Sequence, residues 1–595
     1  MALASSVRIE IAGKKVEDFL EFYIDQKMHQ VQEFRILCRM DTFETPDDSV
    51  LNQSKNFIGS PVIIAISTFN SGWQDSSPGF LFKGFIHSVR AVKSNLNEED
   101  KIILEGYSPE ILLNNSPGCL SFENMTLKQI VENVLKAYPR DILASKVDPV
   151  FTEQIPYCVR YNESGLAFLQ RLAARYGEWM FYNGKEFIFG KWNGNQEELI
   201  LGKELRNLDF SINLRAPKFK YVSYNYLNGE KLETEVANSD GNSQQNEVGK
   251  VAHSTSWKQM GQKNTQFFPH LNAVPGKEMI AQKTSVEIKA SGIAMNMSGI
   301  KGESENMNLI PGTKISVKEA KATGGEINYG DYFIDSVHHH CDNLMNYENT
   351  FTGIPAEAKN PPYSNPEMFP VCEPQTAIVK DNKDPEKLGR VKVSFFWQES
   401  GQMSPWIRVS TPYAAADRGF YFIPEIDDEV LVGFDGGDAE RPFVIGSLYH
   451  GKNKPMSGWP NNNNRFKGFV TKSNLRLEFD DDKKVTTIDT PGGNKIIISD
   501  DQKSILMNDQ NNNKVELSSS GIVLKSPGDI SIQSSSKITI DASAGIEISS
   551  EADVKMKGLN IDQNADVGFT AKANATAELS ASGNTTVKGA LVMIN

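Results

Sequence analysis

The chain has 595 residues, of which 39% are hydrophobic and 23% are charged. This balance is typical of a folded protein, and the length predicts about four domains. The formal net charge of −13 argues against a surface that binds nucleic-acid phosphates. The five cysteines are scattered and form no Cys-x-x-Cys pair, which favours reduced thiols in a cytoplasmic product over a disulfide framework.

The N-terminal residues do not have the pattern of a secretory signal. Val7, Ile9 and Ile11 alternate with polar residues, which predicts a strand, whereas a signal peptide has a basic start followed by an apolar run. The longest aliphatic run, Val62 to Ile66, is too short to cross a bilayer. If the protein leaves the cell, we expect it to do so without a signal peptide or membrane anchor.

The first part of the chain is rich in short segments in which apolar and polar residues alternate, and these predict strands of barrels or sandwiches. Two helices are predicted among them. Near 126–138, Thr126 and Gln129 form a capping box before an apolar helical face. Near 164–176, a second apolar face is followed by Gly177, a typical helix end.

Two stretches divide the rest of the chain. Six prolines between Pro355 and Pro374 predict an extended linker and a domain boundary. Between 371 and 450, short strands with glycine-marked corners predict a small closed barrel of the OB type. The next segment, 451–474, contains four consecutive asparagines and is predicted to be a second linker.

From residue 475 onward the chain is repetitive, and between 521 and 556 the repeat is eight residues long. Each repeat has two large apolar residues two positions apart, so both lie on one face of a short strand. Small or polar residues follow on that face. This pattern predicts a β-solenoid whose stacked repeats bury the apolar row. The pairs are Ile522 and Leu524, Ile530 and Ile532, Ile538 and Ile540, Ile546 and Ile548, and Val554 and Met556.

Beyond Met556 the large residues move from even to odd positions. The step from Val554 to Leu559 is five residues instead of eight. A one-residue slip turns every side chain to the other face of a strand, so we expect a tight corner at Gly558 and a narrower shaft beyond it. The odd-numbered pairs include Leu559 and Ile561, Val567 and Phe569, and Leu591 and Met593.

The eight-residue period leaves two architectures open. One chain could form a three-sided coil with three octads per turn, or three chains could each contribute one octad per face. A single-chain solenoid needs polar caps, whereas the sequence from Leu591 to Asn595 is apolar. This apolar end favours a tip that another molecule covers.

Residues with the chemistry of an active or metal site are few. In the run His338-His339-His340-Cys341, only His338 and His340 share a strand face, and no second ligand pair follows. The run Asp480 to Lys484 lacks the spacing of a calcium loop and predicts a hairpin turn. No GxSxG or HExxH motif occurs. We expect no catalytic residue and no cofactor; a metal at the two histidines or along the shaft axis stays open.

Several segments resemble one family. The block Leu388 to Trp397, followed by Ser404 to Val409, resembles the OB-domain core of VgrG, the spike protein of type VI secretion systems. The stretches Ile423 to Phe434 and Gly437 to Tyr449 have the order and spacing of the same family. Upstream, Tyr161 to Leu172 looks like the family's hub signature.

The resemblance implies a mainly β protein in four parts. These are a hub of paired β-barrels over 1–360, an OB domain over 371–450, a linker over 451–474, and a needle over 475–595 in which three chains wind into an intertwined β-helix. The needle core would be the pairs from Ile522 to Phe569. The tip contacts would be Leu591, Met593 and Asn595.

The implied function is that of a structural spike of a contractile injection machine, which punctures target envelopes and carries effectors. The implied partners are two further copies, a PAAR-repeat tip protein, an Hcp-like ring of the inner tube, baseplate proteins, effector cargo with its chaperones, and transiently the target membrane. The spike would assemble on the baseplate in the cytoplasm and be ejected to the extracellular space or the target cell.

Two other interpretations compete with a type VI spike. A phage, prophage or extracellular tailocin spike would have the same fold. A β-helix enzyme that degrades polysaccharides is less favoured, because such enzymes carry charged clusters on one solenoid face and residues 521–593 show none. The sequence leaves the cargo, the target cell and the source organism open.

Overall fold

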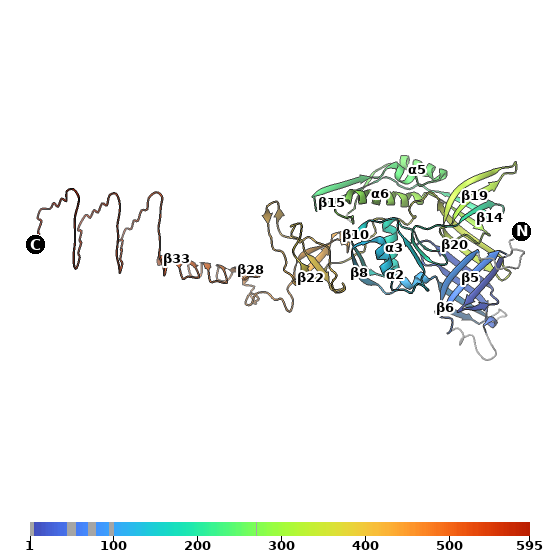
Figure 1. The fold of residues 1–595 in the computed structure, drawn as a ribbon, viewed down its shortest axis with the longest axis horizontal. Coiled ribbons are helices and arrows are strands. Elements are labelled where there is room, and N and C mark those ends of the chain that lie inside the picture. The colour runs from blue at the N-terminus through green and yellow to red at the C-terminus, as the bar shows by residue number, and fades with distance from the viewer. Residues whose placement is uncertain (1–4, 44–54, 69–78, 94–99, 269–270, 595) are drawn as a thin grey trace. The chain divides into compact units, whose positions relative to one another are not determined.

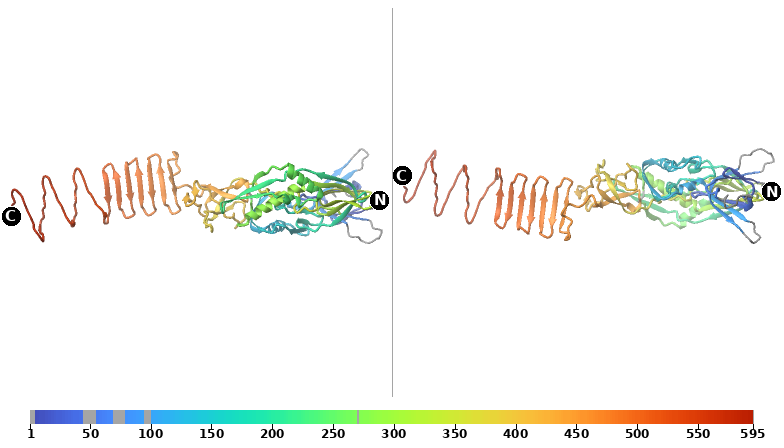
Figure 2. Two further views of the ribbon diagram at one scale, coloured as in Figure 1. Left: turned by 90° about the horizontal axis from the view of Figure 1, so that it is seen from above. Right: turned by 90° about the horizontal axis from the view of Figure 1, so that it is seen from below.

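The computed structural model describes residues 5–43, 55–68, 79–93, 100–268 and 271–594. The chain divides into two compact units, Met1–Pro455 and Met456–Asn595. The first is mainly β with a few helices, as Figures 1 and 2 show. In the second, strands are found only up to Lys525.

A large sheet forms the body of the first unit. Its strands are β1 (Ser5–Ile11), β2 (Lys14–Val16), β3 (Glu21–Lys27), β4 (Glu33–Arg39), β5 (Pro61–Thr68), β6 (Phe80–Val92), β7 (Lys101–Tyr107), β13 (Gln196–Leu201), β14 (Leu205–Ile212), β18 (Ser298–Ser304), β19 (Lys314–Ala320), β20 (Glu326–Asp342) and β21 (Tyr347–Pro355). Their order is β19-β13-β14-β18-β21-β20-β3-β4-β7-β6-β5-β1-β2. A further pairing of β19 with β20 closes the first six strands into a ring, so one barrel of the predicted pair is closed by hydrogen bonds.

Two apolar cores fill this sheet. Inside the ring, Ile315, Val317 and Ile334 are fully buried. A larger core lies between the strands from β3 to β1 and two helices, and it includes Ile24 and Ile36. Because alternate residues of each strand face these cores, the apolar alternation in the sequence correctly predicted the strands.

The two predicted helices are confirmed as α2 (Leu127–Leu135) and α3 (Gly165–Tyr176). Thr126 and Gln129 make the predicted capping box. At α3 the Ser164 side chain accepts the first-turn cap bond, and Gly177 ends the helix with a φ of +67°. Both helices lie in the middle of the unit beside β8 and β10 (Figure 1). The strands of this region are β8 (Gly118–Thr126), β9 (Ser145–Asp148), β10 (Gln154–Glu163), β11 (Met180–Tyr182) and β12 (Phe187–Gly190).

Among the described residues, the structure also has helices that were not predicted from the sequence. The further helices are α4 (Asn238–Asn242), α5 (Glu247–Gln259) and α6 (Glu278–Met295), and they lie with β15 (Phe219–Asn225), β16 (Glu230–Glu235) and β17 (Asn264–Phe267). The buried face of α6 includes Gln282, Ser291 and Gly292, and small or polar residues of this kind hide a helical period. Among the described residues, no helix is long and apolar enough to cross a membrane.

The proline-rich stretch that follows β21 packs against the hub. The Tyr363 hydroxyl donates to the carbonyl of Glu178 at 2.9 Å, and the N–H of Asn365 donates to the carbonyl of Ala174 at 2.8 Å. The Tyr363 side chain is partly buried and packs against two apolar cores of the hub. The predicted linker therefore follows the hub surface.

The OB domain is a four-stranded sheet closed by a short extra segment. Its order is β23-β22-β26-β27, and β24 pairs with β25 in a separate hairpin. Bridges from Val391 to Ile407 and from Val409 to Val444 join the two edges of the sheet through one segment. The strands are β22 (Gln375–Asp381), β23 (Lys392–Phe395), β24 (Ala414–Ala415), β25 (Arg418–Gly419), β26 (Glu429–Phe434) and β27 (Pro442–Ser447). The predicted OB-type barrel is confirmed.

The second unit begins with a seven-stranded antiparallel meander of five-residue strands (Figure 2). They are β28 (Phe466–Val470), β29 (Arg476–Asp480), β30 (Val485–Asp489), β31 (Lys495–Ser499), β32 (Ser504–Asn508), β33 (Lys514–Ser518) and β34 (Gly521–Lys525). β28 lies inside 451–474, which was expected to be a linker.

Residues 526–594 form no strand and run in a wide zigzag (Figure 2). The one-chain, three-sided coil is therefore not formed by these residues. The three-chain β-helix stays a prediction.

Candidate functional site

One face of the meander is apolar and open to solvent. Residues paired directly across neighbouring strands share a face of the sheet. Ile496 pairs with Met507, Met507 with Val515, and Val515 with Leu524. Together with Ile530 these residues line a shallow hollow of about 490 Å³. The sheet of a single chain thus leaves its hydrophobic face without a covering layer.

The octad repeats continue this exposure. In the four repeats that follow β34, the first residues of the large pairs are 51–60% exposed, and the second residues are 66–74% exposed. Burying one such side chain is worth roughly 1.5–3 kcal/mol, so a long row of them in water is strongly unfavourable. Contiguous apolar surface of this kind marks an interaction site. The first residues are Ile530, Ile538, Ile546 and Val554, and the second are Ile532, Ile540, Ile548 and Met556.

The remaining predicted shaft and tip residues are also exposed. Ile561 is 52% exposed and Phe569 is 69% exposed, whereas Leu559 and Val567 reach 101% and 102%. At the predicted tip, Leu591 and Met593 are 77% and 80% exposed, and Asn595 lies outside the described residues.

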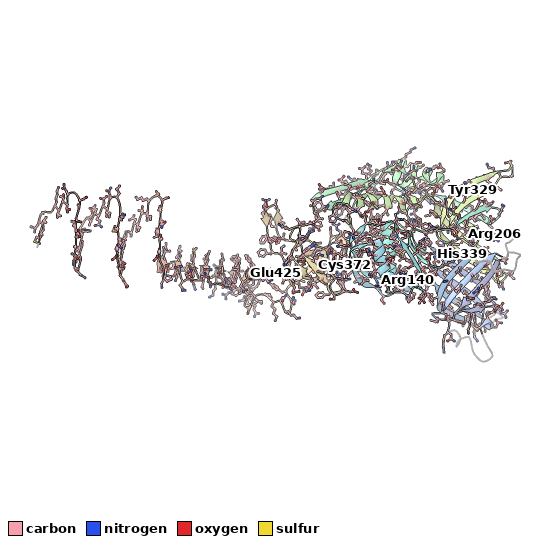
Figure 3. The ribbon with its side chains drawn as sticks, viewed as in Figure 1. Arg140, Arg206, Tyr329, His339, Cys372 and Glu425 are labelled. Atoms are coloured by element: carbon pink, nitrogen blue, oxygen red, sulfur yellow. The ribbon has the colours of Figure 1, made fainter. Side chains whose placement is uncertain are left out.

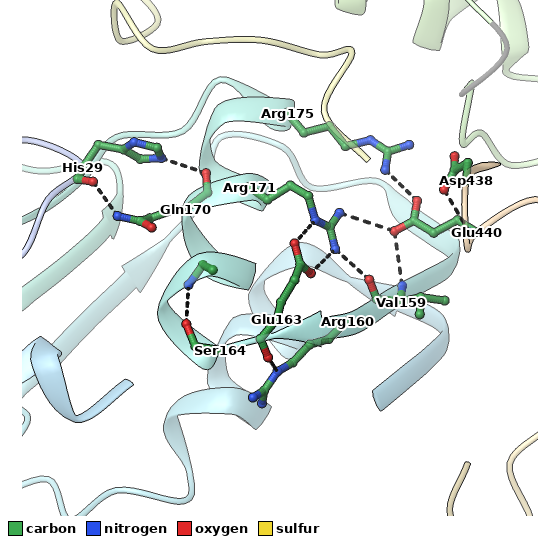
Figure 4. Close-up of polar contacts among 11 residues, drawn as sticks. His29, Val159, Arg160, Glu163, Ser164, Gln170, Arg171, Arg175, Asp438 and Glu440 are labelled. Atoms are coloured by element: carbon green, nitrogen blue, oxygen red, sulfur yellow. Dashed lines mark hydrogen bonds and ion pairs between the residues drawn. The ribbon is translucent and has the colours of Figure 1, made fainter. Parts of the chain in front are cut away.

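A cluster of buried charges joins the hub to the OB domain (Figure 4). Glu440 lies in the turn before β27, and its side chain is 2% exposed. The Arg175 guanidinium, from α3, donates to Glu440 Oε2 at 2.6 Å. Arg171, one turn earlier, lies 3.7 Å from Glu440 Oε1 and makes a bidentate pair with Glu163. The Val159 N–H also donates to Glu440, at 3.2 Å.

This cluster balances its charges. Burial alone would lower the pKa of Arg175, but the neighbouring Glu440 carboxylate raises it, so the guanidinium stays charged. Two arginines face two glutamates, and a buried ion pair is tolerated only with such pairing and additional hydrogen bonds. The cluster therefore fixes α3 against the OB domain.

Sequence reasoning did not identify this junction. Arg171 and Glu440 both lie in segments that carry the family resemblance, but Glu440 and Arg175 are 265 positions apart. Arg171 and Arg175 are one turn apart on α3 but lie off the apolar face predicted from the sequence, so no local pattern indicated that both are buried.

The three histidines of the run lie on β20, and their side chains alternate between its two faces. His338 and His340 share one face, as predicted, and both rings lie against Tyr23. Asp25 Oδ1 accepts a hydrogen bond from His338 Nδ1 at 2.6 Å, and this bond raises the pKa of His338. His339, labelled in Figure 3, is fully buried, has a ring nitrogen 2.7 Å from the Tyr347 hydroxyl, and has its pKa lowered to about 3 by burial. Within the described ranges, no group of three or more His, Cys, Asp or Glu residues is placed to hold a metal.

Two family models match the chain. One, described as the type VI secretion system/phage-baseplate injector OB domain, matches residues 375–449. The other, described as the phage tail baseplate hub, matches residues 55–344. Together the two matches make the chain similar to the hub and OB class of phage-baseplate and type VI injector proteins.

Curated relatives agree with this class. The type VI secretion system spike protein VgrG5 of Pseudomonas aeruginosa is 37% identical over 133 residues, which are 21% of this chain and 17% of that protein. The actin cross-linking toxin VgrG1 of Vibrio cholerae is 25% identical over 389 residues, 60% of this chain and 33% of that protein. The chain thus spans a third or less of the length of these relatives.

A solved structure has the same fold. A chain of the half-lidded Francisella PdpA–VgrG complex matches with a TM-score of 0.53 and 9% identity, covering 88% of each chain. The two family models and the curated relatives make the chain similar to VgrG spike proteins, and the solved structure shows that the fold is shared.

Proposed function

We propose that three copies of this chain assemble into the spike of a contractile injection machine of the type VI kind. The observation that carries the proposal is the apolar face of β28–β34, continued by the octad rows, which one chain leaves in water. Three identical chains, each contributing one face, would bury these rows along a common axis. The shaft would act mechanically, by being driven through a target envelope.

The partners of the spike follow from this role. The hub would contact an Hcp-like tube ring and baseplate proteins, and a PAAR-repeat protein would cover the tip at Leu591 and Met593. Effectors with their chaperones would travel on the spike. The spike would assemble in the cytoplasm and then be ejected. The proposed role has no enzymatic step, which the similarity to baseplate hubs and spike proteins supports.

Sedimentation of the full-length chain tests the assembly. At micromolar concentration we expect a species of three times the chain mass. A monomer under these conditions would contradict the proposal, because the apolar rows would then be stable in water.

A further inference from the structure

The octad region bends at regular intervals, with one exception. The backbone bends sharply at 527–528, 535–536, 543–544, 551–552, 559, 566–567, 574–575, 582–583 and 590–591. Successive bends begin eight residues apart, except that the two repeats from 551 to 566 take 15 residues instead of 16. The spacing between bends is therefore one residue shorter at the place where the large side chains change from even to odd positions.

The distance of a residue from the preceding bend indicates whether it lies at a corner or on the straight segment that follows. Before the short step, the second bend residue is small, as at Gly528 and Ala552, and the first large residue stands two positions later. After the short step, the same rule places Val567 and Leu591 at corners, and it places Phe569 and Met593 on the straight segments between corners. The corner itself falls at Leu559, one residue after the expected Lys557–Gly558.

Exposure distinguishes the corner residues from the inward residues in the first two repeats after the short step. Leu559 and Val567 are 101% and 102% exposed, whereas Ile561 and Phe569 are 52% and 69% exposed. Leu591 and Met593, at 77% and 80%, are equally exposed. A residue at a corner points away from the straight segment that follows it, which explains the complete exposure of Leu559 and Val567.

Gly558 stands directly before the bend at Leu559. A Cβ atom added at Gly558 would lie 3.1 Å from the carbonyl oxygen of Asn560, and one added at Gly589, directly before the bend at 590–591, would lie 3.2 Å from the carbonyl oxygen of Leu591. The backbone before Leu559 therefore turns as it does before a regular bend, which places the corner at Leu559.

We propose that beyond Met556 the three copies meet through a second register, with one large apolar side chain per repeat, and that Leu559 and Val567 stay on the outside of the shaft. In this register Leu579 and Val587 face the partner copies. They are not among the apolar pairs predicted from the sequence. The inference rests on the proposed three-chain assembly. The inward side chains are Ile561, Phe569, Leu579, Val587 and Met593.

Two double variants of the full-length chain test the register, and each replaces one leucine and one valine. Leu579→Asp with Val587→Asp places charges at positions that the proposal buries. Leu559→Asp with Val567→Asp places the same charges at the corners. The readout is the half-time of trypsin cleavage after Lys572, which a closed shaft protects.

We expect the Leu579/Val587 variant to be cleaved at least tenfold faster than the wild type, and the Leu559/Val567 variant to be cleaved at the wild-type rate. Fast cleavage of the Leu559/Val567 variant, or protection of the Leu579/Val587 variant, would overturn the register. A monomeric wild-type chain that is cleaved at once would instead overturn the assembly, so the two failures are distinguishable.

Discussion

The two units of this chain use the same apolar residues in opposite ways. In the hub, Ile24, Ile36 and Ile64 are 0% exposed, because neighbouring strands and helices of the same chain cover them. In the octads, Ile532 and Ile540 are 69% and 70% exposed. Both regions alternate apolar and polar residues along the sequence. The difference shows that these apolar residues are covered within one chain in the hub and left open to solvent in the repeats.

Replacing Ile538 and Ile540 together by aspartate tests the repeat side of this comparison, with the largest expected effect. Two charges per chain in a shared core leave uncompensated buried carboxylates, so the assembled shaft should be lost. Sedimentation and trypsin resistance of residues beyond Lys525 report this. The matched control is Thr539→Asp, whose side chain points to the other face. Equal behaviour of the two variants would mean that the Ile538 face stays in water.

Replacing Glu440 tests how strongly buried contacts within one chain stabilise the first unit. Glu440→Ala leaves the buried Arg175 without its carboxylate, and breaking a buried pair in this way costs about 3–5 kcal/mol. Urea unfolding of the full chain, followed by tryptophan fluorescence, measures the loss. The control is Lys277→Ala, which removes an exposed pair with Glu153 and should cost at most about 1 kcal/mol. A loss of similar size in both variants would mean that the junction is hydrated.

The contrast between these two sites explains what could be predicted from sequence. The strands and helix caps of the first unit were predicted correctly because each is a pattern of neighbouring residues, whereas residues 526–594 form none of the strands expected from the octads. The Glu440–Arg175 pair was missed because it depends on the folded path between two distant segments. The inward face beyond Met556 was ambiguous, since the parity change was visible but the bend at Leu559 was not.

The stability of the hub should depend on pH through two neighbouring histidines, whose contributions have opposite signs. Burial lowers the pKa of His339 to about 3, so below about 6.5 the unfolded chain binds a proton that the folded chain does not. Its contribution should reduce stability by about 2 kcal/mol between pH 7 and pH 5. Asp25 raises the pKa of His338, whose smaller stabilisation is present below about 6.5 and is lost as the pH rises through the folded pKa.

Urea unfolding at pH 7 and pH 5 separates the two histidines. His339→Gln should lower stability at pH 7 but reduce the further loss at pH 5. His338→Gln should increase that loss slightly, because its side chain is 42% exposed and the Asp25 pair is screened by water. An unchanged acid loss in His339→Gln would show that this ring is protonated in the folded hub.

The smallest expected effect concerns the start of α2, where the hub depends on one short-range motif. Thr126→Ala removes the hydroxyl that accepts the N–H of Gln129 and donates to Gln129 Oε1, whereas the backbone N–H of residue 126 still donates to that oxygen. Loss of such a cap costs about 1 kcal/mol. The control in the same turn is Lys128→Ala, whose side chain is 54% exposed and whose loss should stay within about 0.5 kcal/mol. Because α2 packs into the hub core and makes no part of the exposed rows, sedimentation of Thr126→Ala should match that of the wild type. A change in assembly state with an unchanged urea midpoint would contradict the independence of the two units.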